Sequence, residues 1–244
     1  MTDNQTARRL IGSLDLTSLN RDDTEAKITA LCQKACTPYG YTAAVCIYPE
    51  WVGLAKKLLK KTPVKIATVV NFPAGGHDFK QMKEEIKKAL GSGADEIDAV
   101  FPYRDFLAGN LDECRRFLEI VSRETAKQTS KIILETGALR HVSAIAAATR
   151  LCLGYDVGFI KTSTGKTEVS ATVGAANIIL ETIRDSGKNT GFKASGGIRD
   201  FEEARKYLTL SEVIMGENWP DPDHFRIGAS SLLDDLIRVI EGGD

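Results

Sequence analysis

The sequence contains few of the residues that build disulfide frameworks and metal sites. It has five cysteines and three histidines in 244 residues. The cysteines are scattered and odd in number, which argues against a disulfide framework, and we expect them to be buried free thiols. His77, His141 and His224 are isolated, and none has a second histidine or a carboxylate at a spacing suited to zinc. We therefore expect neither a metal nor another cofactor.

An excess of one charge and long hydrophobic runs are also missing. The formal net charge is −1, and no basic cluster provides the positive field that binding to nucleic acid or to an anionic membrane surface requires. No run approaches the roughly 20 apolar residues that span a bilayer, and residues 1–10 lack the apolar core of a signal peptide. We expect a cytoplasmic protein that binds small molecules and neither nucleic acid nor membranes.

Strand-like runs alternate with amphipathic helical stretches along the chain. After a polar, helical start, runs that favour strands lie at 42–48, 65–71, 95–101, 131–136, 157–162 and 190–194, with weaker ones at 212–215 and 225–227. Stretches with apolar residues three and four positions apart lie at 51–61, 79–90, 111–126, 171–185 and 201–208. About eight such units, without a dinucleotide loop after the first strand, favour a closed barrel over a doubly wound sheet. We predict an α/β protein that consists of one (β/α)₈ TIM-barrel domain over residues 1–244, with an extra N-terminal helix.

Two lysines lie at the ends of strand-like runs and lead into glycine loops. Lys193 follows Lys161 by 32 residues, about one strand–helix repeat, so we expect neighbouring strands to carry them. Two adjacent ammonium groups lower the pKa of each other, and a neutral lysine can attack a carbonyl to form a Schiff base. The alternative is that both side chains extend into solvent at the mouth of the barrel. The spacing alone does not rank the two lysines.

Asp98 ends another strand-like run and has apolar, β-branched neighbours. An unpaired carboxylate there would be costly, so Asp98 needs either a cation or a proton. Across the mouth of the barrel from the lysines, it could transfer protons through a water molecule. The alternative is a purely structural salt bridge to Lys193. We expect the adjacent Asp95 and Glu96 to face solvent or a helix.

Three glycine loops are candidates for an anion site. Residues 196–197 and 228–231 precede helices that we expect Asp200 and Ser231 to cap, so their backbone amides could bind a phosphate. Gly165 and Lys166 could add an amide and a positive charge. Each pair of glycines is weak evidence alone, because turns need glycine for conformational reasons. The convergence of three loops predicts a phosphate site.

Four motifs resemble those of the deoxyribose-phosphate aldolases, a class I aldolase family. They are FIKTSTGK at 159–166, GFKASGG at 191–197, DEIDAVFP at 95–102 and RIGASS at 226–231. The resemblance extends from LDLT at 14–17 to the last helix and implies a metal-independent aldolase with a (β/α)₈ barrel. The similar proteins cleave 2-deoxy-D-ribose 5-phosphate reversibly to D-glyceraldehyde 3-phosphate and acetaldehyde, in the catabolism of deoxyribose phosphate.

The resemblance also implies roles for individual residues. It makes Lys161 the Schiff-base nucleophile, Lys193 the cation that tunes the pKa of Lys161 and exchanges protons, and Asp98 a proton donor and acceptor. It places substrate binding at Asp15, Thr17, Cys46, Thr164, Gly165, Lys166, Gly196, Gly197, Gly228, Ser230 and Ser231. It further implies a homodimer. Two alternatives to this enzyme are another class I barrel aldolase acting on a ketose phosphate and a non-catalytic protein that binds sugar phosphates.

Overall fold

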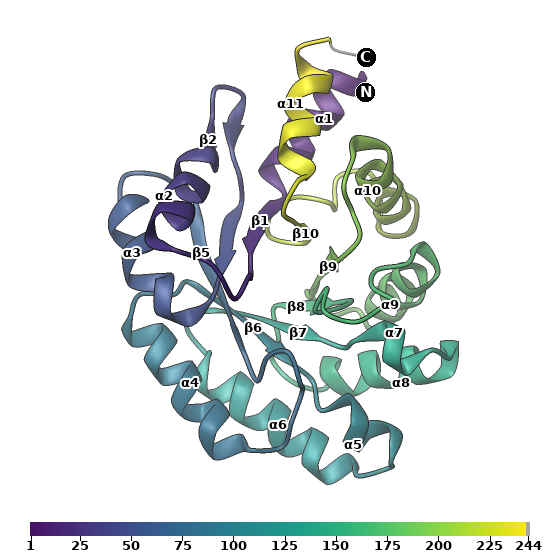
Figure 1. Ribbon diagram of the computed structural model, residues 1–244. Coiled ribbons are helices and arrows are strands. Elements are labelled where there is room, and N and C mark those ends of the chain that lie inside the picture. The colour runs from purple at the N-terminus through teal and green to yellow at the C-terminus, as the bar shows by residue number, and fades with distance from the viewer. Residues whose placement is uncertain (243–244) are drawn as a thin grey trace.

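Eight parallel strands form a closed barrel (Figure 1). The computed structural model describes residues 1–242, and residues 243 and 244 lie outside the described part. The strands, in their order around the barrel, are β1 (Leu14–Ser18), β10 (Phe225–Ala229), β9 (Gly191–Ser195), β8 (Phe159–Lys161), β7 (Thr129–Ile133), β6 (Glu96–Val100), β5 (Lys65–Val70) and β4 (Ala44–Ile47). Because all the strands run in the same direction, their carboxyl ends meet at one mouth of the barrel. The predicted (β/α)₈ fold is confirmed.

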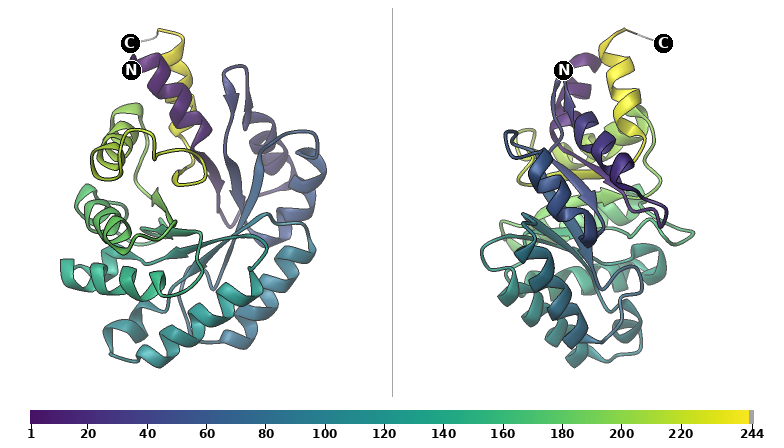
Figure 2. Two further views of the ribbon diagram at one scale, coloured as in Figure 1. Left: turned by 180° about the vertical axis from the view of Figure 1, so that it is seen from behind. Right: turned by 60° about the vertical axis from the view of Figure 1, so that its left-hand side comes forward.

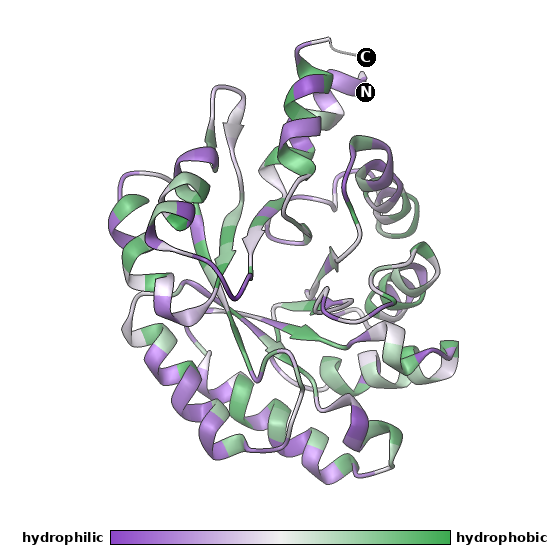
Figure 3. Ribbon diagram, in the orientation of Figure 1, coloured by the Kyte–Doolittle hydropathy of each residue, from purple (hydrophilic) through white to green (hydrophobic). Residues whose placement is uncertain are grey.

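Helices surround the barrel, and they bury apolar faces against the strands. They are α1 (Asp3–Gly12), α2 (Glu25–Lys34), α3 (Val52–Leu58), α4 (Phe79–Gly91), α5 (Tyr103–Leu107), α6 (Leu111–Glu124), α7 (Thr136–Leu139), α8 (Val142–Leu153), α9 (Val173–Ser186), α10 (Phe201–Met215) and α11 (Leu232–Ile240). In α4, Phe79, Met82, Ile86 and Ala89 recur at intervals of three and four residues, and all four are buried. The hydrophobic residues of α4 and α6 form stripes on otherwise polar helices (Figure 3). The amphipathic pattern thus directs each helix onto the barrel.

The first and last helices of the described chain pack against each other. The predicted N-terminal helix, α1, packs against α11, and the two helices lie side by side in Figures 1 and 2. The Asn4 side-chain amide donates a hydrogen bond of 2.9 Å to the carbonyl of Ile240. A small hairpin of β2 (Cys36–Thr37) and β3 (Gly40–Tyr41) lies outside the barrel, and a 3₁₀ turn, Pro49–Trp51, precedes α3. No helix within residues 1–242 is long and apolar enough to cross a membrane.

One predicted barrel strand is wrong, and one strand of the barrel is missing from the prediction. The β-branched run at 212–215 does not form a strand, because it is the last turn of α10, which ends before Gly216. The first strand of the barrel is instead β1, a five-residue segment that follows α1 almost directly. The number of strands in the prediction is correct, but the identity of one is not.

The two predicted helix caps have different outcomes. The Asp200 carboxylate accepts a hydrogen bond of 2.9 Å from the backbone N–H of Glu203, so Asp200 caps α10. Ser231 makes no side-chain capping bond at α11, so the prediction that it caps this helix is wrong. The hydroxyl of Ser231 is therefore not occupied by the helix that it precedes.

The interior of the barrel is divided between apolar and charged side chains. Leu19, Ala44, Cys46, Ala67 and Val69 form an apolar cluster on the side of β4 and β5. On the opposite side, the inward-facing side chains carry charge, although they are almost completely buried. This charged half forms the floor of the candidate site.

Candidate active site

Lys161 and Lys193 lie directly opposite each other on adjacent strands. Their Cα atoms are register partners in the parallel pair β8 and β9, as the spacing predicts. Lys161 is 3% exposed and Lys193 is 0% exposed, so the alternative, in which both side chains extend into solvent, is wrong. Two buried amines on one wall of a barrel require compensating carboxylates.

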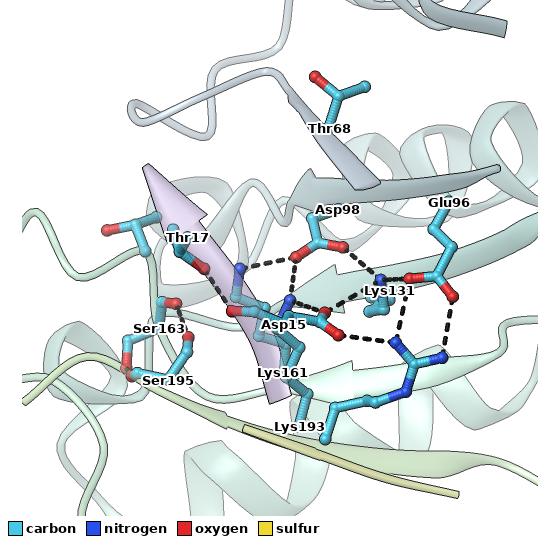
Figure 4. A network of polar contacts seen from close by, with 12 residues as sticks. Asp15, Thr17, Thr68, Glu96, Asp98, Lys131, Lys161, Ser163, Lys193 and Ser195 are labelled. Carbon is cyan, nitrogen blue, oxygen red and sulfur yellow. Dashed lines mark hydrogen bonds and ion pairs between the residues drawn. The ribbon is translucent and has the colours of Figure 1, made fainter. Parts of the chain in front are cut away.

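Asp98, on β6, provides the nearest carboxylate, and it contacts three lysines directly (Figure 4). Its Oδ2 accepts hydrogen bonds from Lys161 Nζ at 2.7 Å and from Lys193 Nζ at 2.8 Å. Its Oδ1 accepts a third, of 2.9 Å, from Lys131 Nζ on β7. The expectation that Asp98 lies across the mouth from the lysines is therefore wrong, because it contacts both of them directly. The ion pair with Lys193 is present, and the same carboxylate also contacts Lys161.

Asp15, on β1, is the second carboxylate of the charged floor. One of its oxygens accepts a hydrogen bond from Lys193 Nζ, and the other accepts one of 2.6 Å from the guanidinium of Arg226 on β10. Asp15 is completely buried. It lies below the mouth, where it orients Lys193.

Glu96, Lys131 and Arg226 complete the charged floor, and the sequence interpretation missed all three. Lys131 Nζ donates a hydrogen bond of 2.5 Å to Glu96 Oε2, and Arg226 donates one of 2.9 Å to Glu96 Oε1. Glu96 is 3% exposed, so the prediction that it faces solvent or a helix is wrong. Strand periodicity could have indicated the inward position of Glu96, because Glu96 precedes Asp98 by two residues and therefore shares its face of the strand.

The environment shifts the pKa values of the two central lysines in opposite directions. Burial lowers the pKa of Lys161; the Asp98 carboxylate opposes this effect, and the neighbouring Lys193 adds to it. Burial would also lower the pKa of Lys193, but contact with Asp15 and Asp98 raises that pKa above its ordinary value. The expectation that each lysine lowers the pKa of the other thus fails for Lys193. Lys161 is the more readily neutralised amine, and Lys193 remains charged.

The carboxylates that contact these lysines remain ionised. Burial would raise the pKa of Asp98, but Lys131, Lys161 and Lys193 lower it well below its ordinary value. The same balance of burial against Lys193, Lys131 and Arg226 lowers the pKa of Asp15. At neutral pH, Asp98 and Asp15 are therefore both carboxylates.

A cavity of about 310 Å³ opens above Lys161 at the carboxyl ends of the strands. The predicted substrate-binding residues that line it are Thr17, Thr164, Gly165, Lys166, Gly196, Gly197, Gly228, Ser230 and Ser231. Leu19, Asn20, Ser195, Ile198, Arg199 and Ala229 also line it, although the sequence did not indicate them. Lys161 is the one member of the charged floor among the lining residues. Its amine is therefore the charged group of the floor that a ligand in this cavity meets first.

Asp15 and Cys46 lie beneath this cavity and do not line it. The Cys46 thiol is completely buried, and burial raises its pKa. A neutral thiol packed among Ala44, Ala67 and Val69 fills space. The structure therefore does not bring Asp15 or Cys46 into position for direct contact with a ligand in the cavity.

The three predicted glycine loops converge on the outer part of the cavity. Gly165, Gly196 and Gly197 adopt positive φ angles of 73°, 87° and 86°, which glycine adopts without strain. The second of these loops leads into α10, where the backbone N–H groups of Arg199, Phe201 and Glu203 already donate to carboxylates. The amides that could bind an anion here are therefore those of the glycine loop itself. Lys166 Nζ reaches across the mouth and donates a hydrogen bond of 2.6 Å to the carbonyl of Leu19. Amides, an ammonium and the exposed Ser230 and Ser231 thus surround a space suited to a phosphate.

Glu135 holds the first of these loops in place. This buried residue follows β7 in a left-handed conformation, with φ 56° and ψ 61°. Its Oε2 accepts a hydrogen bond of 2.5 Å from the hydroxyl of Thr164, and its Oε1 accepts one of 3.1 Å from the hydroxyl of Thr167. The carboxylate therefore fixes the segment that carries Gly165 and Lys166.

Gly228 provides the space that Lys193 occupies. A Cβ atom at this position would lie 2.9 Å from the Cβ of Ser195 and 3.1 Å from the Cε of Lys193. We expect Gly228→Ala to displace Lys193, to lower kcat by about 10- to 100-fold and to reduce the free energy of unfolding by about 1–3 kcal/mol. Steady-state kinetics and urea denaturation measure the two effects.

Gly174→Ala is the matched control, because a Cβ atom there would meet no atom within 4 Å. We expect this variant to keep the kcat and the stability of the unmodified protein or to gain slightly in stability. Equal kinetic constants for the two variants would contradict the steric role of Gly228.

Comparisons with known proteins agree with this geometry. A deoxyribose-phosphate aldolase from Agrobacterium fabrum is 45% identical over 242 residues, which cover 98% of this chain and 93% of that protein. A crystal structure from Toxoplasma gondii, described as a deoxyribose-phosphate aldolase, superposes with a TM-score of 0.89 at 25% identity and covers 99% of this chain and 98% of its own. A similarly described structure from Coccidioides immitis has a TM-score of 0.85 at 28% identity and covers 96% and 86% of the two chains.

The family assignment follows from the sequence itself. The model of the DeoC/LacD family aldolases matches residues 9–236, nearly the whole chain. This range contains both central lysines, Asp98 and all three glycine loops. The chain therefore belongs to the DeoC/LacD family of aldolases.

Proposed function

We propose that this protein cleaves 2-deoxy-D-ribose 5-phosphate reversibly to D-glyceraldehyde 3-phosphate and acetaldehyde, through a Schiff base on Lys161. The observation that carries this proposal is a buried amine at the floor of a cavity whose outer loops suit a phosphate. An aldehyde carbon placed over Lys161 and a phosphate placed in the loops define the two ends of one short substrate. The relatives described as deoxyribose-phosphate aldolases support the choice of sugar.

In the first step, the neutral amine of Lys161 attacks C1 of the open-chain aldehyde. The resulting carbinolamine loses water and becomes a protonated imine. Lys193 lies beside Lys161 and carries the proton that the departing hydroxyl needs. Asp98 contacts both amines, so it can relay protons between them, and Lys193 regains its proton when the imine is hydrolysed at the end of the cycle.

In the second step, the bond between C2 and C3 breaks. The proton of the 3-hydroxyl passes through water to the Asp98 carboxylate, which lies beneath the cavity, while the electron pair of the bond moves onto C2 and the imine nitrogen. This forms D-glyceraldehyde 3-phosphate and an enamine on Lys161. Protonation of the enamine at C2 and hydrolysis of the imine then release acetaldehyde and restore the free amine.

The loops around the cavity bind the phosphate in this proposal. Gly165 and Gly197 present backbone amides, Lys166 provides the counter-charge, and Ser230 and Ser231 provide hydroxyls at the start of α11. Substrate binding would move the Lys166 ammonium from the carbonyl of Leu19 to the phosphate. Neither Asp15 nor Cys46 lines the cavity. In this scheme Asp15 acts through its contact with Lys193, and Cys46 fills space in the apolar part of the barrel.

The contacts of Glu135 predict an effect specific to phosphorylated substrates. In Glu135→Gln, one side-chain oxygen becomes an amide that cannot accept from a threonine hydroxyl, so the loop carrying Lys166 loosens. We expect KM for deoxyribose 5-phosphate to rise about 10-fold, with a much smaller change for unphosphorylated deoxyribose. Kinetics with both sugars measure this difference. Glu181→Gln, an exposed change on α9, is the control, and equal losses with both sugars would show that Glu135 does not act through the phosphate site.

The function is tested by the retro-aldol reaction of deoxyribose 5-phosphate, followed with and without a chelator. We expect formation of acetaldehyde and D-glyceraldehyde 3-phosphate at the same rate in both cases. In the synthetic direction, acetaldehyde should act as the donor. A requirement for a ketone donor would instead indicate a ketose-phosphate aldolase, and binding without turnover would indicate a sugar-phosphate binding protein.

We also propose that the protein acts in the cytoplasm, in the catabolism of deoxyribose phosphates, and that it forms a homodimer. The resemblance to the deoxyribose-phosphate aldolases supports these statements. Light scattering of the purified protein measures the oligomeric state, and a mass of one chain would contradict the dimer.

A further inference from the structure

The charged floor of the barrel is a closed ring of six alternating charges. Following the contacts, the ring passes through Arg226, Asp15, Lys193, Asp98, Lys131 and Glu96, and it returns to Arg226. Every member is at most 4% exposed. Figure 4 shows that the side chains of Asp15, Glu96 and Asp98 and the amines of the lysines converge within the barrel.

Lys161 is attached to this ring and is not part of it. Its amine has one contact with the ring, to Oδ2 of Asp98. The ring is neutral by itself, because three cations alternate with three carboxylates. A protonated Lys161 is therefore a surplus positive charge in a region with almost no access to water, where uncompensated charge is costly. Burial and Lys193 lower the pKa of Lys161, in agreement with this count.

Within residues 1–242, the ring contains every full charge that faces Lys161 from the barrel strands. The titratable and charged groups that face it from the other strands are Asp15 of β1, Cys46 of β4, Glu96 and Asp98 of β6, Lys131 of β7, Lys193 of β9 and Arg226 of β10. β5 contributes the apolar Ala67 and Val69. Glu135 and Lys166 lie above, in the loops. The thiol of Cys46 is neutral, since burial raises its pKa.

The far side of the ring is held rigidly. The Nε of Arg226 donates to the carbonyl of Pro222, and the guanidinium lies 5.5 Å from the centre of the Phe159 ring. Its other nitrogens bridge Asp15 and Glu96. An arginine does not lose its proton in this range of pH, so it fixes one positive charge in the ring permanently.

We propose that Glu96 and Arg226, which do not line the cavity, are positioning residues that set the pH at which Lys161 becomes reactive, because they fix the charge of the ring beneath it. This inference rests on the proposed role of Lys161 as the nucleophile. Glu96 and Arg226 therefore affect the reactivity of Lys161 as well as the stability of the barrel.

The charges of the two residues predict opposite effects. Glu96→Gln removes a negative charge, leaves the ring positive and favours the neutral form of Lys161, so the pH profile of imine formation should move to lower pH. Arg226→Gln removes a positive charge, so the profile should move to higher pH. We expect each shift to be about one pH unit. The double variant restores a neutral ring, and its profile should lie close to that of the unmodified protein.

The experiment measures the rate at which acetaldehyde and cyanoborohydride label Lys161 at pH values from about 5 to 9, with the labelled peptide quantified by mass spectrometry. Arg226→Lys keeps the charge and is expected to leave the midpoint unchanged, which separates charge from shape. If Arg226→Gln does not fold, Lys131→Met removes the same charge from the ring and should also move the profile to higher pH.

The ion pair between Arg9 and Glu212 outside the barrel is the matched control. Arg9→Gln and Glu212→Gln should leave the midpoint in place. Shifts of Glu96→Gln and Arg226→Gln in the same direction, or no shift in either, would overturn the inference. Absence of label on Lys161 in the unmodified protein would instead contradict the proposed function, so the two failures are distinguishable.

Discussion

Replacing Lys161 with alanine is expected to lower kcat for deoxyribose 5-phosphate by about 10⁴-fold or more, while the protein remains folded. The reason is that no other amine of the charged floor lines the cavity. Lys193 is completely buried, remains charged because contact with Asp15 and Asp98 raises its pKa, and does not line the cavity. A retro-aldol assay measures kcat, and circular dichroism checks the fold.

Lys188→Ala is the control for this prediction, because Lys188 is an exposed lysine in the loop before β9. We expect its kinetic constants to match those of the unmodified protein. A Lys161→Ala variant that turns over substrate at a normal rate would contradict the role of Lys161 in the Schiff base.

The second large effect is expected for Asp98→Asn. The amide leaves three lysines, Lys131, Lys161 and Lys193, around a neutral group and removes the acceptor for the 3-hydroxyl proton. We expect kcat to fall by about 10²- to 10⁴-fold and the free energy of unfolding at neutral pH to fall by about 3–5 kcal/mol. Kinetics and urea denaturation test the two parts.

The loss of stability in Asp98→Asn should depend on pH in one direction. The pKa of Asp98 is lower in the folded protein than in the unfolded chain, where it is about 3.9. Its stabilising contribution is therefore fully present above that value and is lost as the pH falls towards the folded-state pKa. We expect the difference from the unmodified protein to shrink below about pH 4. Asp185→Asn, an exposed change on α9, is the control, and a difference that grows with acid would contradict the ionised state of Asp98.

Much of the site was predictable from strand periodicity and spacing. One strand–helix repeat separates Lys161 from Lys193, and this alone placed them on adjacent strands. The three glycine loops were predictable because parallel strands bring their carboxyl ends to one mouth. These features depend on local sequence and on the regular geometry of the barrel.

The charged floor was not predictable in the same way. Glu96 and Arg226 are 130 residues apart, and nothing local to either indicates that the other will neutralise it. Charged residues are almost never fully buried unless they are paired, so the sequence predicts that Glu96 faces solvent or a helix. The closure of the barrel, which brings β6 and β10 to opposite sides of one interior, decides which charges are buried together. Strand propensity also led to the wrong prediction at the end of α10, where β-branched residues favour a strand.

The central claim is that Lys161 forms the covalent bond to substrate, and reductive trapping tests it most directly. The protein is incubated with deoxyribose 5-phosphate and borohydride, digested and analysed by mass spectrometry. We predict a single modified site, in the peptide that contains Lys161, with no label on Lys193. Label on Lys193 or on any other residue, or no label during active turnover, would contradict the account.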